Sequence, residues 1–371
     1  MSRELEFERP VLELERQIEE LRRLAAGRDQ LAATVADEGR PKRKKKTDGT
    51  SMMQLESQIL RLEEQAQSLK GQIFSRLTRW QIVQVARHAQ RPYTLDYLQS
   101  TFADFVELHG DRNFGDDPAI VCGLAKLKGE SVMVIGHQKG RTTAENLRRN
   151  FGMPRPEGYR KALRTMRVAE RFGLPIVTLI DTPGAYPGIG AEERGQAQAI
   201  ADCLEGMAAL KVPVVSVVIG EGGSGGALAI GVANRVLMLE FSIYSVISPE
   251  GCASILFKDA SHAERAADAL KLTAPDLTAL GVVDQVIKEP LGGAHRDHPL
   301  AARRLQEALH TELSELVKMK PKELVDDRYR RFRALGAVTE GALRELEPAE
   351  ATKTSSTKRR PASGKSKGAR P

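Results

Sequence analysis

The sequence VVSVVIGEGGSGGALAIG occupies residues 214–231 and joins an apolar run directly to a glycine-rich stretch. The run over residues 214–219 has the length of a strand and is apolar at every position except Ser216. Because an alternating pattern buries only one face, this continuous run predicts a strand buried on both faces, as in layered α/β proteins. Half of residues 220–231 are glycine, which predicts a turn whose backbone N–H groups are open to a ligand.

Further apolar runs of strand length alternate with helical sequence through the middle of the chain. They cover residues 131–135, 175–180, 235–239 and 282–287. We therefore predict an α/β fold with a largely parallel sheet. Two of these runs also end in glycine-rich turns, at Gly136–Arg141 and Asp181–Gly188. Since the carboxyl ends of parallel strands meet at one edge of a sheet, we expect the three turns to form one site.

The N-terminal region carries two seams of apolar residues at heptad spacing, which predict two helices that pack on each other or on a partner. The seam residues are Val11, Leu14, Ile18, Leu21 and Ala25, then Leu55, Ile59, Leu62, Ala66, Leu69 and Ile73. A highly basic segment separates them, and we expect a flexible insertion over residues 27–50.

Four regions follow from these patterns. We predict an N-terminal helical region over residues 1–90 and an α/β domain over 91–290. C-terminal helices over 291–345 include helical sequence at 300–316 and 321–335, and a disordered basic tail covers 346–371.

The basic charge is concentrated in the tail. The formal net charge is +7, and residues 351–371 contain seven basic residues and no acidic one. Binding of nucleic acid by the tail or by the basic insertion is therefore possible, but no other feature of the sequence supports it.

Several classes of protein are disfavoured by composition. No run approaches the roughly 18 to 20 apolar residues of a membrane-spanning helix, and the first residues lack the apolar region of a signal peptide. Cys122, Cys203 and Cys252 form no C-x-x-C pair, so neither a disulfide framework nor a metal site is expected. We expect a cytoplasmic protein with no membrane partner.

The stretch over residues 220–231 matches more than one short motif. Gly220, Gly222 and Gly225 satisfy G-x-G-x-x-G, and Glu240 lies at the spacing of a dinucleotide-binding fold. A P-loop is excluded, because Gly226 stands where that motif requires lysine.

The same stretch also satisfies the G-x-S-x-G motif of hydrolases around Ser224. Asp284 and either His295 or His298 follow in a workable order for a catalytic triad, so a Ser-dependent α/β hydrolase is the alternative function. We favour a third interpretation, in which backbone N–H groups at a strand-to-helix junction form an oxyanion hole and no nucleophilic side chain is needed.

Several long motifs together resemble the carboxyltransferase alpha-subunit family of bacterial acetyl-CoA carboxylase. They are Gly136–Arg141, Asn150–Pro154, Pro156–Ala162, Asp181–Gly188, Gly220–Gly231 and Ser245–Ala253, with further similarity at Trp80–Ile82, Arg91–Tyr97 and Pro290–Arg296. The resemblance spans roughly residues 5–340. The insertion over 27–50 and the tail beyond about residue 345 depart from the family pattern without touching a matched motif.

The resemblance implies a crotonase-like ββα-superhelix core with an N-terminal helical hairpin and C-terminal helices. Members of the family pair with a zinc-ribbon beta subunit in an α2β2 assembly and work with a biotin carboxyl carrier protein and biotin carboxylase. The cofactor is biotin, present as carboxybiotin on the separate carrier protein. The implied reaction transfers CO2 from carboxybiotin to acetyl-CoA and gives malonyl-CoA, the first committed step of fatty-acid synthesis.

The resemblance also implies roles for particular residues. The oxyanion hole of the alpha subunit corresponds to Gly225 and Gly226, which are the expected catalytic residues. The expected substrate-binding residues are Gly184 and Gly188 in the biotin-side wall, Tyr186 in the lining of the pocket, and Lys139 and Arg141 near the CoA phosphates. His137 directly follows a predicted strand, and we expect it to be structural rather than a base.

Overall fold

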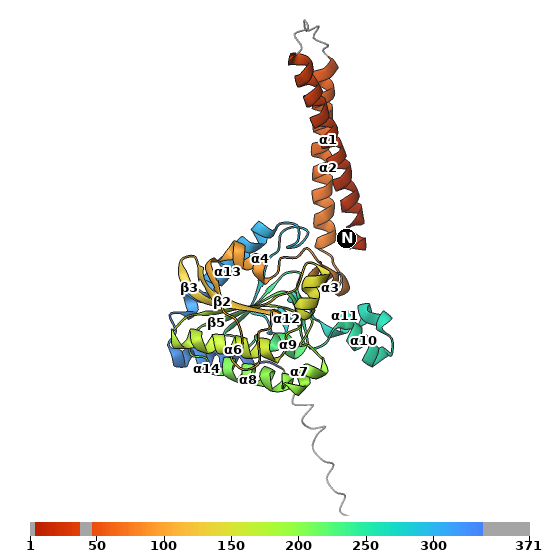
Figure 1. Ribbon diagram of the computed structural model, residues 1–371. Helices are drawn as coiled ribbons and strands as arrows, with labels where there is room; N and C mark the ends of the chain where they lie inside the picture. The colour runs from red at the N-terminus through yellow and green to blue at the C-terminus, as the bar shows by residue number, and fades with distance from the viewer. Residues whose placement is uncertain (1–3, 38–46, 337–371) are drawn as a thin grey trace, which may run out of the picture. The chain divides into compact units, whose positions relative to one another are not determined.

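The computed structural model describes residues 4–37 and 47–336, apart from the side chains of 27–52, and Figure 1 shows their arrangement. The helices are α1 (Arg9–Asp37), α2 (Thr47–Phe74), α3 (Arg79–Ala86), α4 (Thr94–Thr101), α5 (Thr143–Arg148), α6 (Pro156–Arg171), α7 (Ile189–Glu193), α8 (Gln196–Ala209), α9 (Ser224–Leu228), α10 (Pro249–Phe257), α11 (Ala263–Leu270), α12 (Ala274–Ala279), α13 (His298–Leu316) and α14 (Pro321–Arg333). The strands are β1 (Ala103–Glu107), β2 (Ile120–Leu127), β3 (Glu130–His137), β4 (Ile176–Thr182), β5 (Val214–Gly223), β6 (Arg235–Leu239), β7 (Ile243–Ser245) and β8 (Gln285–Ile287).

One sheet organises the α/β part of the chain. Its strands follow the order β1-β2-β3-β4-β5-β6-β8, and β7 pairs with the end of β5. The pairs β1–β2 and β2–β3 are antiparallel, whereas β3, β4, β5, β6 and β8 run parallel. The predicted parallel sheet is therefore confirmed at its centre, and the carboxyl ends of β3, β4 and β5 lie side by side.

Helices cover both faces of this sheet (Figure 1), which explains the continuous apolar runs. On one face, Ile176 and Ile180 of β4 pack in a core with Met166 of α6. On the other face, Val177 and Leu179 of the same strand pack in a core with α4 and α13. Every residue of β4 is buried as a result.

The two N-terminal helices α1 and α2 lie side by side (Figure 1). Val11, Ile18 and Ala66 of the predicted seams are buried, and the other seam residues are partly buried. An ion pair of 2.7 Å between Lys70 and Glu15 joins the two helices. The prediction of paired amphipathic helices is confirmed.

The predicted bounds of the flexible insertion, residues 27–50, are wrong, because helix occupies both of its ends. Helix α1 continues to Asp37 and α2 already begins at Thr47, while residues 38–46 lie outside the described part of the chain. Alanine, leucine and glutamine at residues 30–33 favour helix, and this local propensity extends α1 beyond its apolar seam. The basic tail over 346–371 also lies outside the described residues, so its disorder stays a prediction, as do the domain boundaries.

Strands β1, β2 and β7 were not predicted from the sequence, because each lacks a long apolar run. Most of β1 is exposed at the edge of the sheet, and β7 has only three residues. β2 alternates between buried and exposed residues over its second half and contains Gly123. The other strands and the C-terminal helices lie within a few residues of their predicted positions.

A buried ion pair joins the start of the α/β part to the segment that follows its last strand, β8. Arg91 donates two hydrogen bonds of 2.8 Å to the carboxylate of Glu289, and both side chains are almost completely buried. Glu289 also accepts hydrogen bonds from the backbone N–H groups of Phe241 and Ala294. Its negative charge is therefore surrounded by donors.

We expect Glu289→Gln to lower the free energy of unfolding by about 3 kcal/mol, because it leaves the Arg91 guanidinium buried without its counter-charge. Urea unfolding followed by circular dichroism measures this loss. Lys288→Gln is the matched control, since Lys288 pairs with Glu240 at the surface and should cost less than about 1 kcal/mol. Similar losses of unfolding free energy in the two variants would contradict the prediction that the buried ion pair contributes more to stability than the exposed one.

Candidate active site

The glycine-rich turns after β4 and β5 touch through their backbones. A Cβ atom on Gly226 would lie 2.5 Å from the backbone nitrogen of Ala185, and one on Gly223 would lie 2.1 Å from the carbonyl oxygen of Pro183. Only glycine allows so close an approach. The turn after β3 reaches the same place, because Nζ of its residue Lys139 lies 2.7 Å from Asp181 Oδ1 and 2.8 Å from Glu221 Oε2. The expected convergence of the three turns is confirmed.

Helix α9 begins in a strained turn at the end of β5. Ser224 has a φ of 55°, in the left-handed region that side chains other than glycine rarely adopt. No side chain caps this helix at Gly223, and the first N–H groups of a helix have no partner within it. Gly225 is half-buried and Gly226 is buried. The turn therefore presents adjacent backbone donors from a fixed position.

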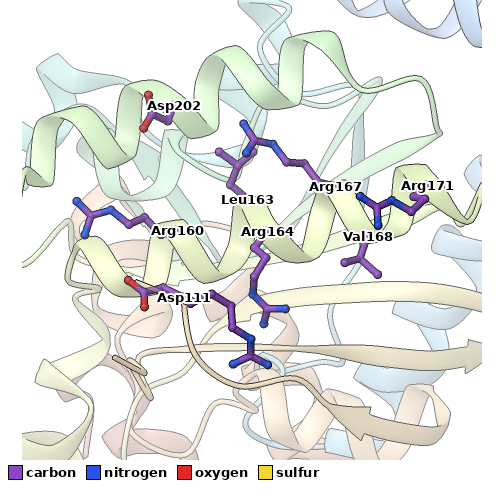
Figure 2. A pocket seen from close by; sticks show the side chains of 9 residues that line it. Asp111, Arg160, Leu163, Arg164, Arg167, Val168, Arg171 and Asp202 are labelled. Atoms are coloured by element: carbon purple, nitrogen blue, oxygen red, sulfur yellow. The ribbon is translucent and has the colours of Figure 1, made fainter. Parts of the chain in front are cut away.

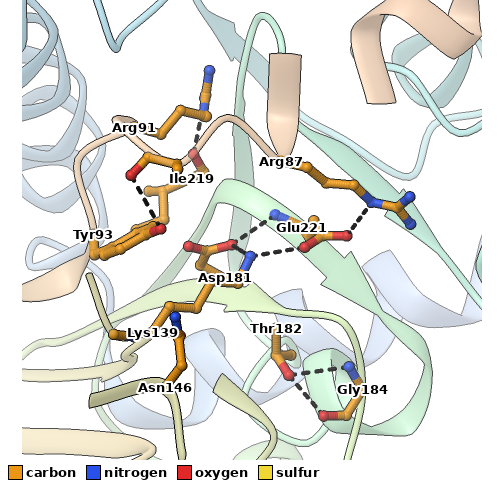
Figure 3. A network of polar contacts seen from close by, with 12 residues as sticks. Arg87, Arg91, Tyr93, Lys139, Asn146, Asp181, Thr182, Gly184, Ile219 and Glu221 are labelled. Atoms are coloured by element: carbon orange, nitrogen blue, oxygen red, sulfur yellow. Dashed lines mark hydrogen bonds and ion pairs between the residues drawn. The ribbon is translucent and has the colours of Figure 1, made fainter. Parts of the chain in front are cut away.

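A network of charges that is buried at its centre lies at the strand ends beside these turns (Figure 3). The Nζ atom of Lys139 lies 2.7 Å from Asp181 Oδ1 and 2.8 Å from Glu221 Oε2. Arg87 Nε lies 2.6 Å from Glu221 Oε1 and extends the network to Glu250. The N–H group of Glu221 donates to Asp181 Oδ1 at 2.9 Å. The network therefore ties the ends of β3, β4 and β5 together.

Lys139 and Glu221, at the centre of this network, stabilise each other's charge. Burial works against the charge of Lys139, but Asp181 and Glu221 more than offset it and raise the pKa of the ammonium group above its usual value. Burial likewise works against the charge of Glu221, but Lys139 and Arg87 lower the pKa of its carboxyl group to about 2.

Glycine makes room for the network within the strands. A Cβ atom on Gly220 would lie 2.4 Å from Asp181 Oδ1, so a larger residue there would displace the carboxylate. Asp181 directly precedes the turn that contains Gly184, and Glu221 directly precedes the turn that contains Gly226. The charges thus set the positions of the two turns relative to each other.

The predicted biotin-side residues lie together in the turn after β4. The Tyr186 ring packs over Gly188, where a Cβ would lie 2.3 Å from the ring, and the Arg155 guanidinium lies 5.0 Å from its centroid. Gly184 is held by Thr182, whose hydroxyl accepts its N–H and donates to its carbonyl oxygen (Figure 3). A Cβ on Gly184 would meet no atom within 4 Å, so the space beside this residue is open.

The two basic residues predicted to meet CoA phosphates have other partners. The side chain of Lys139 is only 12% exposed between two carboxylates, so its contacts do not fit the predicted contact with a phosphate. Arg141 pairs with Asp96, donates to Ala89 and stacks on Tyr93, but it keeps 37% of its side chain exposed. A phosphate contact by Arg141 stays a prediction.

His137 is completely buried, and this burial lowers its pKa to about 3. A group with so low a pKa is a weak base at neutral pH. The physical setting of His137 therefore agrees with a structural role.

Comparisons with known proteins identify the family. A family model described as acetyl co-enzyme A carboxylase carboxyltransferase-like matches residues 4–336. The acetyl-coenzyme A carboxylase carboxyl transferase subunit alpha of Geobacter metallireducens is 58% identical over 337 residues, which cover 91% of this chain and 98% of the relative. The chain belongs to the alpha-subunit family of acetyl-CoA carboxylase carboxyltransferases. Its counterpart in Thermus thermophilus is 57% identical over 336 residues, covering 91% of this chain and 99% of the relative.

Solved structures support the fold class predicted for an alpha subunit. A chain of the Pseudomonas malonate decarboxylase hetero-tetramer in complex with coenzyme A aligns with a TM-score of 0.51 at 18% identity. The alignment covers 68% of this chain and 97% of that chain. The predicted crotonase-like α/β core is confirmed. In the part of this alpha subunit that the structure describes, no helix is both long and apolar enough to cross a membrane.

The hydrolase alternative finds no support in this alpha subunit. A Ser-dependent triad requires a continuous chain of hydrogen bonds from serine through histidine to an acid. Asp284 instead accepts hydrogen bonds from Arg331 and the backbone of Val236. His298 contacts the carbonyl oxygen of Gln90, and His295 stacks on His88.

Sequence analysis missed the charged network, although a signal was present. Asp181 follows the mainly apolar run over residues 175–180, and Glu221 stands among glycines at the end of another apolar run. An acid at the carboxyl end of a buried strand needs a partner, which could have been sought among the nearby basic residues. Glu250 lies at the start of α10, where Ser248 Oγ accepts the N–H of Gly251 and Pro249 is the first helical residue.

Proposed function

We propose that this chain is the alpha half of a carboxyltransferase that moves CO2 from carboxybiotin to acetyl-CoA and yields malonyl-CoA for fatty-acid synthesis. The observation that carries the proposal is the pair of adjacent backbone donors at Gly225 and Gly226, held where the glycine-rich turns converge. This arrangement occurs in a chain whose relatives are carboxyl transferase alpha subunits.

The proposed reaction develops negative charge on two oxygen atoms, one of the acetyl thioester and one of the biotin ureido group. When bound, carboxybiotin supplies the CO2 and a ureido nitrogen that takes a proton from the acetyl methyl group. The N–H groups of Gly225 and Gly226 would hold one of these oxygens, and donors so placed are commonly worth about 3 to 4 kcal/mol. The residues present fit such a substrate, because the space beside Gly184 is open and faces no side chain.

The remaining residues position this site rather than react. The ion pairs of Lys139 with Asp181 and Glu221 hold the two turns in register. When the cofactor on its carrier protein supplies the reactive groups, the protein contributes by positioning the substrates and stabilising the charges that develop.

The proposal includes the partners that the family implies. A zinc-ribbon beta subunit completes the active site in an α2β2 assembly, and biotin carboxyl carrier protein and biotin carboxylase deliver carboxybiotin. The proposed compartment is the cytoplasm.

The reverse reaction tests the proposal most directly. Malonyl-CoA and a biotin analogue are mixed with the chain alone, then with a matching beta subunit, and release of acetyl-CoA is followed. We expect activity only in the mixture. No activity from folded and assembled subunits would contradict the proposed function.

Ser224→Ala separates the proposed transferase from the hydrolase alternative. We expect the variant to keep carboxyltransferase activity within about threefold of the original, because alanine preserves every backbone donor that the oxyanion hole uses. The assay is the reverse reaction in the presence of the beta subunit. A loss of carboxyltransferase activity of about 1,000-fold or more in a folded variant is the signature of a removed nucleophile and would contradict an oxyanion hole made of backbone donors alone.

A further inference from the structure

An arginine-lined groove lies on α6 outside the residues discussed above (Figure 2). Four of its arginines are spaced four, three and four residues apart and therefore share one face of α6. A fifth, Arg112, comes from the connection between β1 and β2. The groove has a volume of about 460 Å³. Its lining consists of the five arginines with Asp111, Leu163, Val168 and Asp202.

The charges of this groove are not neutralised by the chain itself. Among the described residues, none of the five arginines forms an ion pair with a carboxylate, although Arg87, Arg91 and Arg194 elsewhere do. The two acids in the wall are engaged with other donors. Asp111 Oδ1 accepts three backbone N–H groups of its own loop, and Asp202 accepts a hydrogen bond from Gln198. The groove therefore carries an excess of positive charge.

Several of these guanidinium groups are held in place by neutral acceptors. Arg164 donates to the carbonyl oxygens of Gly110 and His109 at 3.1 and 3.2 Å, and Arg112 donates to His109 at 3.1 Å. Arg160 donates to the carbonyl oxygen of Arg194. A carbonyl orients a guanidinium without cancelling its charge, and each arginine keeps further N–H donors for an anion. Arg167 and Arg171 remain exposed beside this fixed set.

We propose that this groove binds the diphosphate group of a nucleotide. Neighbouring arginines on one helix face lie about 5 to 6 Å apart at their Cβ atoms, and each guanidinium matches a phosphate with two parallel hydrogen bonds. The cavity lies within the range of about 300 to 1,000 Å³ that is usual for small-molecule sites. A guanidinium plane and the apolar side chains of Leu163 and Val168 offer surfaces on which a base can pack.

The nucleotide has two possible sources, a free diphosphate such as ADP or the nucleotide end of CoA. The second source rests on the function proposed above, whereas the first does not. Binding is therefore measured without turnover, so that failure of the groove and failure of the proposed function give different results.

The test is calorimetric titration of the full chain, alone and with the beta subunit, using ADP, tripolyphosphate and CoA as probes. We expect saturable binding of ADP that weakens about tenfold or more in the double variant Arg164→Gln/Arg167→Gln. The control Arg61→Gln/Arg303→Gln removes the same charge from exposed positions on α2 and α13 and should change the dissociation constant less than about twofold. Arg164→Lys/Arg167→Lys should restore part of the affinity, because lysine keeps the charge but loses the paired hydrogen bonds.

Two results would overturn the proposal. One is the absence of saturable binding by all three probes, and the other is an equal loss in the groove and control variants. If the groove variant weakens ADP alone, the proposal holds with a free nucleotide as the ligand. If it also weakens CoA and raises KM for malonyl-CoA at unchanged kcat, the proposal holds with CoA as the source. Melting temperatures within a few degrees of the original confirm that the variants compared are folded.

Discussion

Gly226→Ala is expected to lower kcat of the reverse carboxyltransferase reaction about 100-fold or more. The added Cβ atom would lie 2.5 Å from the backbone nitrogen of Ala185 and 2.5 Å from the carbonyl carbon of Gly184. Both neighbours are backbone, so relief requires the two turns to move apart. Such a movement displaces the N–H groups at the start of α9 from the position where charge develops in the reaction.

Gly225→Ala is the matched control for this prediction. A Cβ there would approach only the side chain of Ile200, at 3.8 and 3.9 Å, which is ordinary van der Waals contact. The variant keeps its backbone N–H group and should retain activity within about threefold. Co-purification with the beta subunit and circular dichroism establish that both variants fold. Equal losses in the two variants would contradict the claim that the position of the backbone donors decides activity.

The contrast between these two glycines shows where sequence reasoning stops. The continuous apolar runs at β4 and β5 predicted a sheet covered on both faces, because alternate residues of each strand need a separate core. The meeting of the glycine-rich turns followed from the predicted parallel topology, whereas the order of the strands came only from the structure. Sequence alone treated Gly225 and Gly226 alike, whereas only the structure reveals that one adjoins the backbone of Gly184 and the other does not.

The partners of the charged residues could not be predicted from the sequence either. The family resemblance placed Lys139, two residues after the end of β3, near the phosphates of CoA. Its actual partners, Asp181 and Glu221, lie 42 and 82 residues further along the chain. Pairings over such separations depend on the order of strands in the sheet, which short-range patterns do not encode. The edge strand β1 was missed for the opposite reason, since its exposed residues carry no apolar pattern.

Lys139→Met is expected to destabilise the fold and to impair catalysis together. The substitution keeps most of the apolar stem but leaves Asp181 and Glu221 buried without the charge that lies between them. Removing one partner from a buried ion pair typically costs about 3 to 5 kcal/mol. Because the same carboxylates anchor the turns of Gly184 and Gly226, we also expect kcat to fall about tenfold or more, with a smaller change in KM.

The matched control is Lys126→Met, which removes an ammonium group from an exposed ion pair with Asp104. Exposed pairs contribute less than about 1 kcal/mol, so this variant should unfold almost as the original does. Urea unfolding gives the stabilities, and the reverse reaction gives kcat and KM. A loss of stability in Lys139→Met with unchanged kcat would contradict its positioning role.

The dependence on pH provides a readout that a general packing defect would not give. In the original chain Lys139 and Arg87 lower the pKa of Glu221 to about 2, below its ordinary value of 4.5. The stabilisation from this carboxylate is therefore fully present above pH 4.5 and is lost as the pH falls toward 2. In Lys139→Met the facing carboxylates repel each other, so one of them takes up a proton with a raised pKa and the sign reverses. The variant should lose less stability relative to the original at pH 5 than at pH 8. A loss that is the same at both pH values would contradict the proposed buried charge network.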